Sequence, residues 1–292
     1  MGALLSIPVL SYLLIPSMSS YGTSLNLIFF YLTWTTLVLS HGPLKVELVG
    51  TTAVRLIFYL IPSVLFFLFD ILIPSASVVL KVYGKDGLPQ GKKKKYGSSE
   101  LKVAGWAIFN LILGIAVQGL IEFVLTRVLG VKSRLKVTTK LPLPWDIIKG
   151  VGRALIIREI LQYLVHRYAL HSWTPFQQYH NDWYHSIHTP YPLTAYYDHP
   201  VAYLLRHFLP TFLPAAAFRC HLLTYMLYLS IVSLEETFAH SGYKPMPTSF
   251  FIGGDELEDD IPEQSNGESI AEKFVEKKPR RSHRRKTREN VH

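Results

Sequence analysis

The chain has a single cysteine, Cys220, among 292 residues. One thiol excludes an internal disulfide framework, and with it a small secreted domain held together by disulfides. It also excludes a cysteine-rich zinc or iron–sulfur site, so any bound metal must be held by histidine and carboxylate. Charged residues are scarce as well: they make up 17% of the chain, whereas hydrophobic residues make up 49% and gather in long runs. At least three runs approach or exceed the roughly 20 residues needed to cross a bilayer, which predicts an all-α membrane protein.

The N-terminus lacks the basic stretch of a secretory signal, because the first 16 residues are apolar and uncharged. No cleaved signal peptide is therefore predicted. The formal net charge is +9, but residues 255–292 hold 9 basic and 10 acidic residues, so the positive excess lies in residues 1–254. In loops between membrane spans, Lys and Arg set the topology and meet anionic headgroups. This placement does not fit nucleic-acid binding.

The apolar runs predict a multi-span helical bundle. Long helices are expected at residues 22–40, 53–80, 103–129, 148–168, 201–217 and 220–239. Pro62 and Pro74 interrupt the second of these runs, and the last two are expected to join around Pro210 and Pro214. Asp70 lies within the second run. A carboxylate at membrane depth must face protein or water, so Asp70 is expected to be a helix-packing partner rather than part of a substrate path.

Composition divides the chain into three parts: an N-terminal transmembrane region at 1–140, a histidine-rich domain at 141–252, and a charged tail at 253–292. The tail has too few apolar residues to fold alone, so it is predicted to be disordered. Lys92–Lys95 indicates a cytosolic loop. A second basic group follows the run at 103–129, so that run is either strongly tilted or re-entrant, or one basic group lies on the unexpected side.

Nine of the twelve histidines fall between His166 and His240. Because the chain has few carboxylates nearby, this clustering favours an all-nitrogen metal site at the cytosolic face over scattered interfacial histidines. His185 and His188 are three residues apart and share a face on a helix. The members of two other pairs, His166 with His171 and His180 with His185, lie five apart, which is about 140° around a regular helix. Each of these pairs can converge on one metal only if its helix ends or bulges between the two histidines.

Three strings carry a resemblance to a known family: HRYALH from His166, HNDWYHSIHTPYPLTAYYDHP from His180, and EETFAHSGY ending at Tyr243. Together they resemble the histidine boxes of the fatty acid hydroxylase/sterol desaturase superfamily. The match covers roughly Glu159 to Tyr243. Each box alone is a weak signal, but their combination and order are specific.

The resemblance implies a set of metal ligands by position. His166 and His171 match the first box, His180 and His185 match the second with His188 close behind, His199 precedes a proline, and His240 precedes Ser-Gly-Tyr. His207 and His221 match no box and are expected to be structural. Glu236 lies four residues before His240 on the same helical face. Its carboxylate could hydrogen-bond to a metal ligand and so orient it, or it could pair with an arginine.

The chain departs from the family pattern at two places. Tyr184 stands where the second box has a histidine, so that ligand is replaced or supplied by His188. The last histidine box is missing, because the sequence after Gly254 holds only the isolated His283 and His292. The chain is accordingly either a truncated or mis-spliced form, or a divergent member with an incomplete site.

The activity that the resemblance implies is oxidation of a membrane lipid. A non-haem di-iron centre would use O2 to hydroxylate or desaturate a sterol or fatty acyl chain, with electrons from NAD(P)H through a reductase and cytochrome b5. The expected location is the endoplasmic reticulum membrane, as a multi-pass protein. Two alternatives are a catalytically inactive relative that acts as a scaffold, and a histidine-lined metal or proton transporter. A transporter should have ionisable residues in several spans, whereas here the histidines gather after residue 165.

Overall fold

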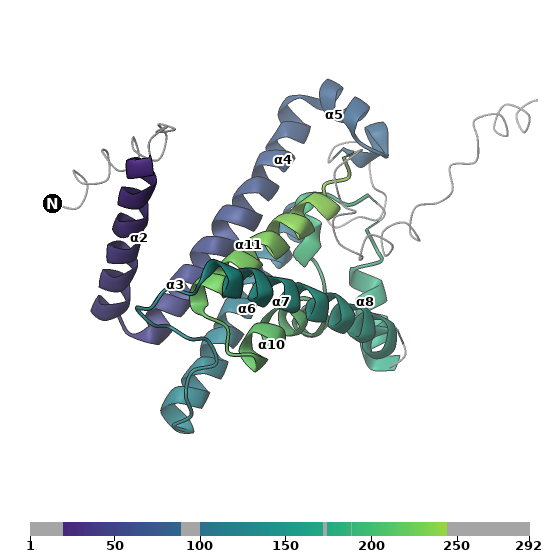
Figure 1. The fold of residues 1–292 in the computed structure, drawn as a ribbon. Coiled ribbons are helices and arrows are strands. Elements are labelled where there is room, and N and C mark those ends of the chain that lie inside the picture. The colour runs from purple at the N-terminus through teal and green to yellow at the C-terminus, as the bar shows by residue number, and fades with distance from the viewer. Residues whose placement is uncertain (1–19, 89–99, 172–173, 188, 244–292) are drawn as a thin grey trace, which may run out of the picture. The chain divides into compact units, whose positions relative to one another are not determined.

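The computed structural model describes residues 20–88, 100–171, 174–187 and 189–243, and all regular elements in these ranges are helical. The α-helices are α2 (Ser20–Ser40), α3 (Pro43–Arg55), α4 (Ile61–Leu72), α5 (Pro74–Leu80), α6 (Glu100–Phe123), α7 (Pro144–Leu164), α8 (Thr174–Trp183), α9 (Pro200–Tyr203), α10 (Leu209–Ala217) and α11 (Leu222–Ala239) (Figure 1). Four π-helical segments continue or join them: η1 (Leu56–Leu60), η3 (Val124–Val128), η4 (Val165–Leu170) and η6 (Leu204–Phe208). Short 3₁₀ turns are η2 (Gly84–Gly87) and η5 (Pro192–Tyr196). The all-α prediction is confirmed.

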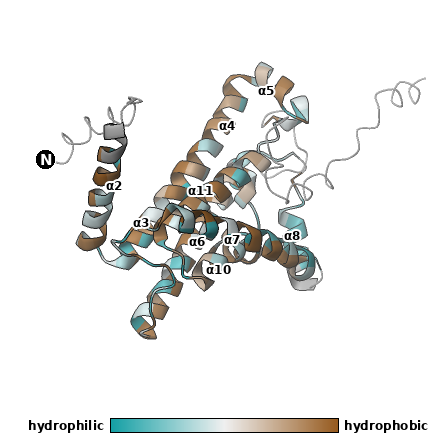
Figure 2. Cartoon of the chain, viewed as in Figure 1, coloured by the Kyte–Doolittle hydropathy of each residue, from teal (hydrophilic) through white to brown (hydrophobic). Residues whose placement is uncertain are grey.

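Three stretches are long and apolar enough to cross a membrane, at Pro43–Leu72, Lys102–Val128 and Leu222–Ala239. Hydrophobic residues extend along α2 and α4 in Figure 2. The predicted run at 53–80 has the wrong bounds: the helix begins at Pro43 and ends at Leu72, where Ile73 leaves helical geometry before α5. Pro62 does not interrupt it, because this proline lies in the first turn of α4 directly after η1. α2 forms where a helix was predicted, but its described apolar part, Leu25–Ser40, is shorter than the three candidate spans.

α3 begins at Pro43, before the predicted start at residue 53, because a charged residue near its start is buried with a polar partner. A hydropathy scale places the charged Glu47 outside a membrane span, yet the Glu47 side chain lies within α3 and is 1% exposed. Its carboxylate accepts a hydrogen bond of 2.8 Å from the side-chain amide of Gln118 on α6. A polar group is tolerated in an apolar bundle when a partner on a neighbouring helix satisfies it.

Asp70 is a packing residue, as predicted. It forms a buried ion pair with Lys81 and accepts a hydrogen bond of 2.6 Å from the hydroxyl of Tyr243. The Lys81 ammonium also donates to the carbonyl of Gly87 at 3.0 Å, and the Val82 amide donates to the carbonyl of Gly242 at 2.9 Å. These contacts attach the segment that follows α11 to the far end of α4.

The last two long helices join at a different place from the one predicted. Pro210 and Pro214 both lie within α10, and the turn to α11 is made by residues 218–221, where Arg219 has a φ of 47°. Pro210 falls in the first turn of α10, where a proline removes no hydrogen bond that the α-helix needs. His221 begins α11 by accepting a hydrogen bond from the Leu223 amide, and this contact agrees with its expected structural role.

α11 is central to the packing and contacts both α3 and α7 (Figure 1). Its approach to α7 is close at Gly150, where a Cβ atom would lie 2.9 Å from the methyl carbon of Thr224. A Gly150→Ala variant is therefore expected to lose about 1–3 kcal/mol of stability through overpacking. Gly152 on the same helix is the matched control, since a Cβ there meets nothing within 4 Å. Gly152→Ala should be neutral or stabilise by about 0.5–1 kcal/mol through helix propensity.

Thermal unfolding of the two purified alanine variants in detergent measures this difference. Equal unfolding temperatures for Gly150→Ala and Gly152→Ala would contradict the close packing of α7 on α11.

Candidate metal centre

The first pair of histidines is brought together by a change of helix type. α7 becomes π-helical at Val165, and the amide of His171 donates to the carbonyl of His166 at 3.2 Å, five residues back. A π-turn bonds residue i to residue i+5, so two side chains five apart come to lie on nearly the same side. The His166 and His171 rings are 4.6 Å apart between centroids, and their Nε2 atoms are 3.1 Å apart. Of the two conditions under which this pair could converge, a helix end or a bulge, the structure has the bulge.

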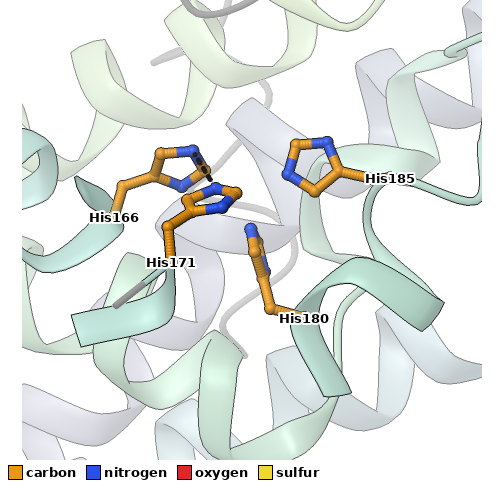
Figure 3. Close-up of side chains that lie close together, drawn as sticks. All are labelled: His166, His171, His180 and His185. Carbon is orange, nitrogen blue, oxygen red and sulfur yellow. Dashed lines mark hydrogen bonds between the residues drawn. The ribbon is translucent and has the colours of Figure 1, made fainter. Parts of the chain in front are cut away.

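The second pair, His180 and His185, comes close together because α8 ends between the two residues. α8 finishes at Trp183, so His180 lies in its last turn and His185 lies beyond it. The centroid of the His180 ring is 5.1 Å from those of both His166 and His185, and 5.5 Å from that of His171. Figure 3 shows all four rings directed toward one common space.

The geometry of the four histidines fits one metal ion. Each offers one nitrogen, and these four atoms lie within 4.8 Å of one another. Imidazole binds ions such as zinc at about 2.0–2.1 Å, so two ligands of one ion lie at most roughly 4.2 Å apart, which small side-chain rotations here would reach. The Nδ1 atom of His166 and the Nε2 atom of His180 are buried and have no hydrogen-bond partner among the described residues. A bound cation would satisfy both.

The environment keeps the imidazoles of His166 and His180 in the neutral form that a metal requires. Burial, together with the positive charge of Arg206, lowers the pKa of His166 and of His180 to about 2 in each case. Both rings are therefore neutral at pH 7. Since protons compete with metal for imidazole nitrogen, this lowering of the pKa favours metal binding over a wide pH range.

Asp198 fixes the orientation of His180. Both side chains are fully buried, and the Nδ1 atom of His180 lies 2.9 Å from a carboxylate oxygen of Asp198. Burial raises the pKa of Asp198 to about 6, so the group is mainly ionised at pH 7 and accepts the hydrogen bond. The Nε2 atom of His180 is then left as a lone-pair donor. The Asn110 amide on α6 holds the Asp198 segment by donating to its carbonyl at 2.8 Å.

The other predicted ligands lie apart from this cluster. His199 begins α9, where it accepts a hydrogen bond from the Val201 amide, and its ring stacks on that of Tyr179 at 4.7 Å. His240 donates from Nδ1 to the carbonyl of Glu236 at 2.9 Å. His188 lies outside the described residues.

Glu236 belongs to a buried group of charges around Arg158. The Arg158 guanidinium contacts Glu159, Glu235 at 3.2 Å and Glu236 at 3.0 Å. A carboxylate oxygen of Glu236 also lies 3.2 Å from Nδ1 of the buried His207. Of the two roles considered for Glu236, orienting a ligand or pairing with an arginine, its side chain has the arginine pair. The expected structural role of His207 agrees with its contact to Glu236.

Sequence reasoning overlooked Asp198 and Arg206. Asp198 immediately precedes His199 in the second string, and a carboxylate within a histidine box was the signal available for it. Arg206 gave no local signal. Its guanidinium is buried, donates to the hydroxyl of Tyr184 at 2.7 Å and lies 3.7 Å from the centre of the Tyr184 ring.

Comparison with known proteins agrees with this geometry. The model of the family described as fatty acid hydroxylase matches residues 151–259. This range contains all four clustered histidines together with Asp198 and His240. No solved structure matches the chain. With the candidate spans, the family match supports a multi-pass membrane protein. The matched domain at residues 151–259 and its histidine cluster support membership of the chain in the fatty acid hydroxylase/sterol desaturase superfamily.

Proposed function

We propose that the chain is a membrane lipid oxidase that uses histidine-bound iron and O2 to hydroxylate or desaturate a sterol or fatty acyl chain. The observation that carries this proposal is the convergence of His166, His171, His180 and His185 within a fatty acid hydroxylase domain. Imidazole nitrogens suit iron, and one of the four histidines, His180, is fully buried. Iron supplies, when bound, the activation of O2 that attack on an unactivated C–H bond requires and that side chains cannot provide.

The residues of the chain prepare the site in two ways. The π-turn η4 and the end of α8 place four imidazole nitrogens around one point, and Asp198 holds the ring of His180 in place. α7 and η4 also carry exposed apolar side chains. Among them are Tyr163, Leu164 and Tyr168, which are 42–56% exposed. A lipid is a substrate class that such a surface can meet directly from the bilayer.

The reaction needs an external source of electrons. Hydroxylation inserts one oxygen atom of O2 into a C–H bond and reduces the other to water with two electrons and two protons. Desaturation removes two hydrogens from the substrate and, with the same two electrons and two protons, reduces both oxygen atoms to water. We propose NAD(P)H as the donor, acting through a reductase and cytochrome b5, with the endoplasmic reticulum membrane as the location.

The test is a reconstituted reaction with product analysis. The full chain is purified in detergent, loaded with Fe²⁺ without oxygen, and placed in vesicles containing sterols and acyl lipids. Cytochrome b5, its reductase, NADH and O2 are then added. Mass spectrometry should show a lipid product about 16 mass units heavier for hydroxylation or about 2 lighter for desaturation. Normally folded protein that holds no iron would contradict the proposal.

A second candidate is a family member without activity. It is favoured by Tyr184, which stands at a histidine position of the family pattern and is bound by Arg206. This candidate predicts a folded protein that binds metal but yields no oxidised lipid from any vesicle tested. The same reconstitution distinguishes the two candidates.

Asp198→Asn tests how far the orientation of His180 contributes. Asparagine keeps the size of the side chain but removes the charge that fixes the protonated Nδ1 of His180. Loss of such a partner behind a metal ligand costs roughly 10–100-fold in metal affinity. Competition with a chromogenic chelator measures the change. Asp182 is an exposed residue of α8, so Asp182→Asn is the matched control and should leave the affinity within about twofold.

A further inference from the structure

The structure provides ligands for one metal ion. Among the residues that it describes, the four clustered histidines are the one group of three or more His, Cys, Asp or Glu side chains that could hold a metal. A closed tetrahedral site such as that of structural zinc uses four protein ligands, so the four ligand atoms of this group can complete the surroundings of a single ion. A second ion would require ligands from outside the group.

Among the described residues, several carboxylates and histidines near the cluster are engaged in other contacts. The Glu235 and Glu236 carboxylates are paired with Arg158. His207 is bound to Glu236. Asp198 accepts hydrogen bonds from His180 and from the backbone amide of His199 at 2.7 Å. Recruiting any of them would break a buried ion pair or hydrogen bond and leave its partner uncompensated.

Among the described residues, His199 and His240 are the family ligands outside the cluster: His199 caps α9, and the Tyr184 side chain lies beside His240. The Tyr184 ring lies 5.2 Å from both His180 and His185 and 6.5 Å from His240. The Tyr184 hydroxyl is 3.4 Å from Nε2 of His240. The Tyr184 side chain therefore contacts His180 and His185 of the cluster as well as His240.

A fixed positive charge lies at the same place. Arg206 is 2% exposed, and its guanidinium lies over the Tyr184 ring and binds the Tyr184 hydroxyl. The Tyr184 hydroxyl that Arg206 binds lies 3.4 Å from Nε2 of His240, and the Tyr184 ring that Arg206 covers lies 5.2 Å from the His180 ring. This one guanidinium thus acts on both sides of Tyr184, where it repels any further cation.

We infer that the centre holds one metal ion per chain rather than the two that the family resemblance implies, and that Arg206 and Tyr184 keep a second ion out. This inference rests on the proposed function, because it concerns the same four histidines. Its consequence is a mononuclear centre of four imidazoles with no carboxylate ligand among the described residues.

Metal stoichiometry tests the inference without any activity measurement. The full chain in detergent is stripped with a chelator, titrated with Co²⁺ under anaerobic conditions and followed by visible absorbance. Metal per chain is then measured by mass spectrometry after desalting. We expect one equivalent in the unaltered chain. We also expect one equivalent in His240→Asn, because His240 is not a ligand of this ion.

The outcomes are distinct. Two equivalents in the unaltered chain, with one lost in His240→Asn, would overturn the inference and leave the proposed function intact. No bound Co²⁺ in protein that elutes as a folded species would overturn both. Gel filtration and thermal unfolding of His240→Asn verify that the variant folds.

A pair of arginine variants tests the role assigned to the charge. Arg206→Met removes the positive charge, whereas Arg206→Lys keeps it and loses the planar guanidinium. We expect Arg206→Met to bind Co²⁺ at least roughly tenfold more tightly than Arg206→Lys, because repulsion between the cations is relieved. Equal affinities in the two variants would overturn the role of the Arg206 charge.

Discussion

His180→Ala is expected to reduce bound iron to about a tenth or less of that in the unaltered chain and to abolish lipid oxidation. His180 is the fully buried member of the cluster, and its ring is fixed by Asp198 while Nε2 faces the other three histidines. Removing it deletes one of four nitrogens and leaves the Asp198 carboxylate without its main partner. Iron content after desalting and product formation in vesicles measure the two effects.

His221→Asn is the matched control for this variant. His221 is another histidine of the matched domain. It is partly buried, and it caps the N-terminus of α11 instead of facing the cluster. Asparagine is a good residue at the start of a helix and can accept the same hydrogen bond from the Leu223 amide. Iron content should therefore be unchanged. Full iron retention by His180→Ala would contradict the assignment of the metal centre.

Arg158→Met is expected to cost about 3–5 kcal/mol of stability, because three carboxylates lose the one cation that they share. Arg158 is 2% exposed and contacts Glu159, Glu235 and Glu236. Methionine has similar length and fills part of the space, so the loss is mainly one of charge compensation. The unfolding temperature in detergent should fall by roughly 10 °C.

Arg153→Met on the same helix is the matched control. Arg153 is exposed, and its guanidinium lies 3.9 Å from the centre of the Phe218 ring without the carboxylates that surround Arg158. A cation–π contact of this kind contributes about 0.5–1 kcal/mol, so the unfolding temperature should change by only a few degrees. A similar fall in both variants would contradict the importance of the buried charge group.

The helical elements were predictable because hydrophobic runs are a local property of the chain. The span at Lys102–Val128 lies within one residue of the expected 103–129. The start of the helix at Pro43 was missed because hydropathy penalises Glu47 whatever its surroundings. In the folded chain, Gln118 satisfies that carboxylate from a helix 71 residues further on.

The sequence by itself determined the class of fold, the kind of ligand and the need for a break in each five-residue histidine pair. These follow from residue type and from the fixed pitch of the α-helix. Only the tertiary structure decided which histidines converge and which are kept apart, and that Asp198 and Arg206 lie beside them. The reason is that such contacts depend on how distant helices pack: the Asn110 side chain that supports the Asp198 segment is 88 residues away in the chain, a separation at which local spacing carries no information.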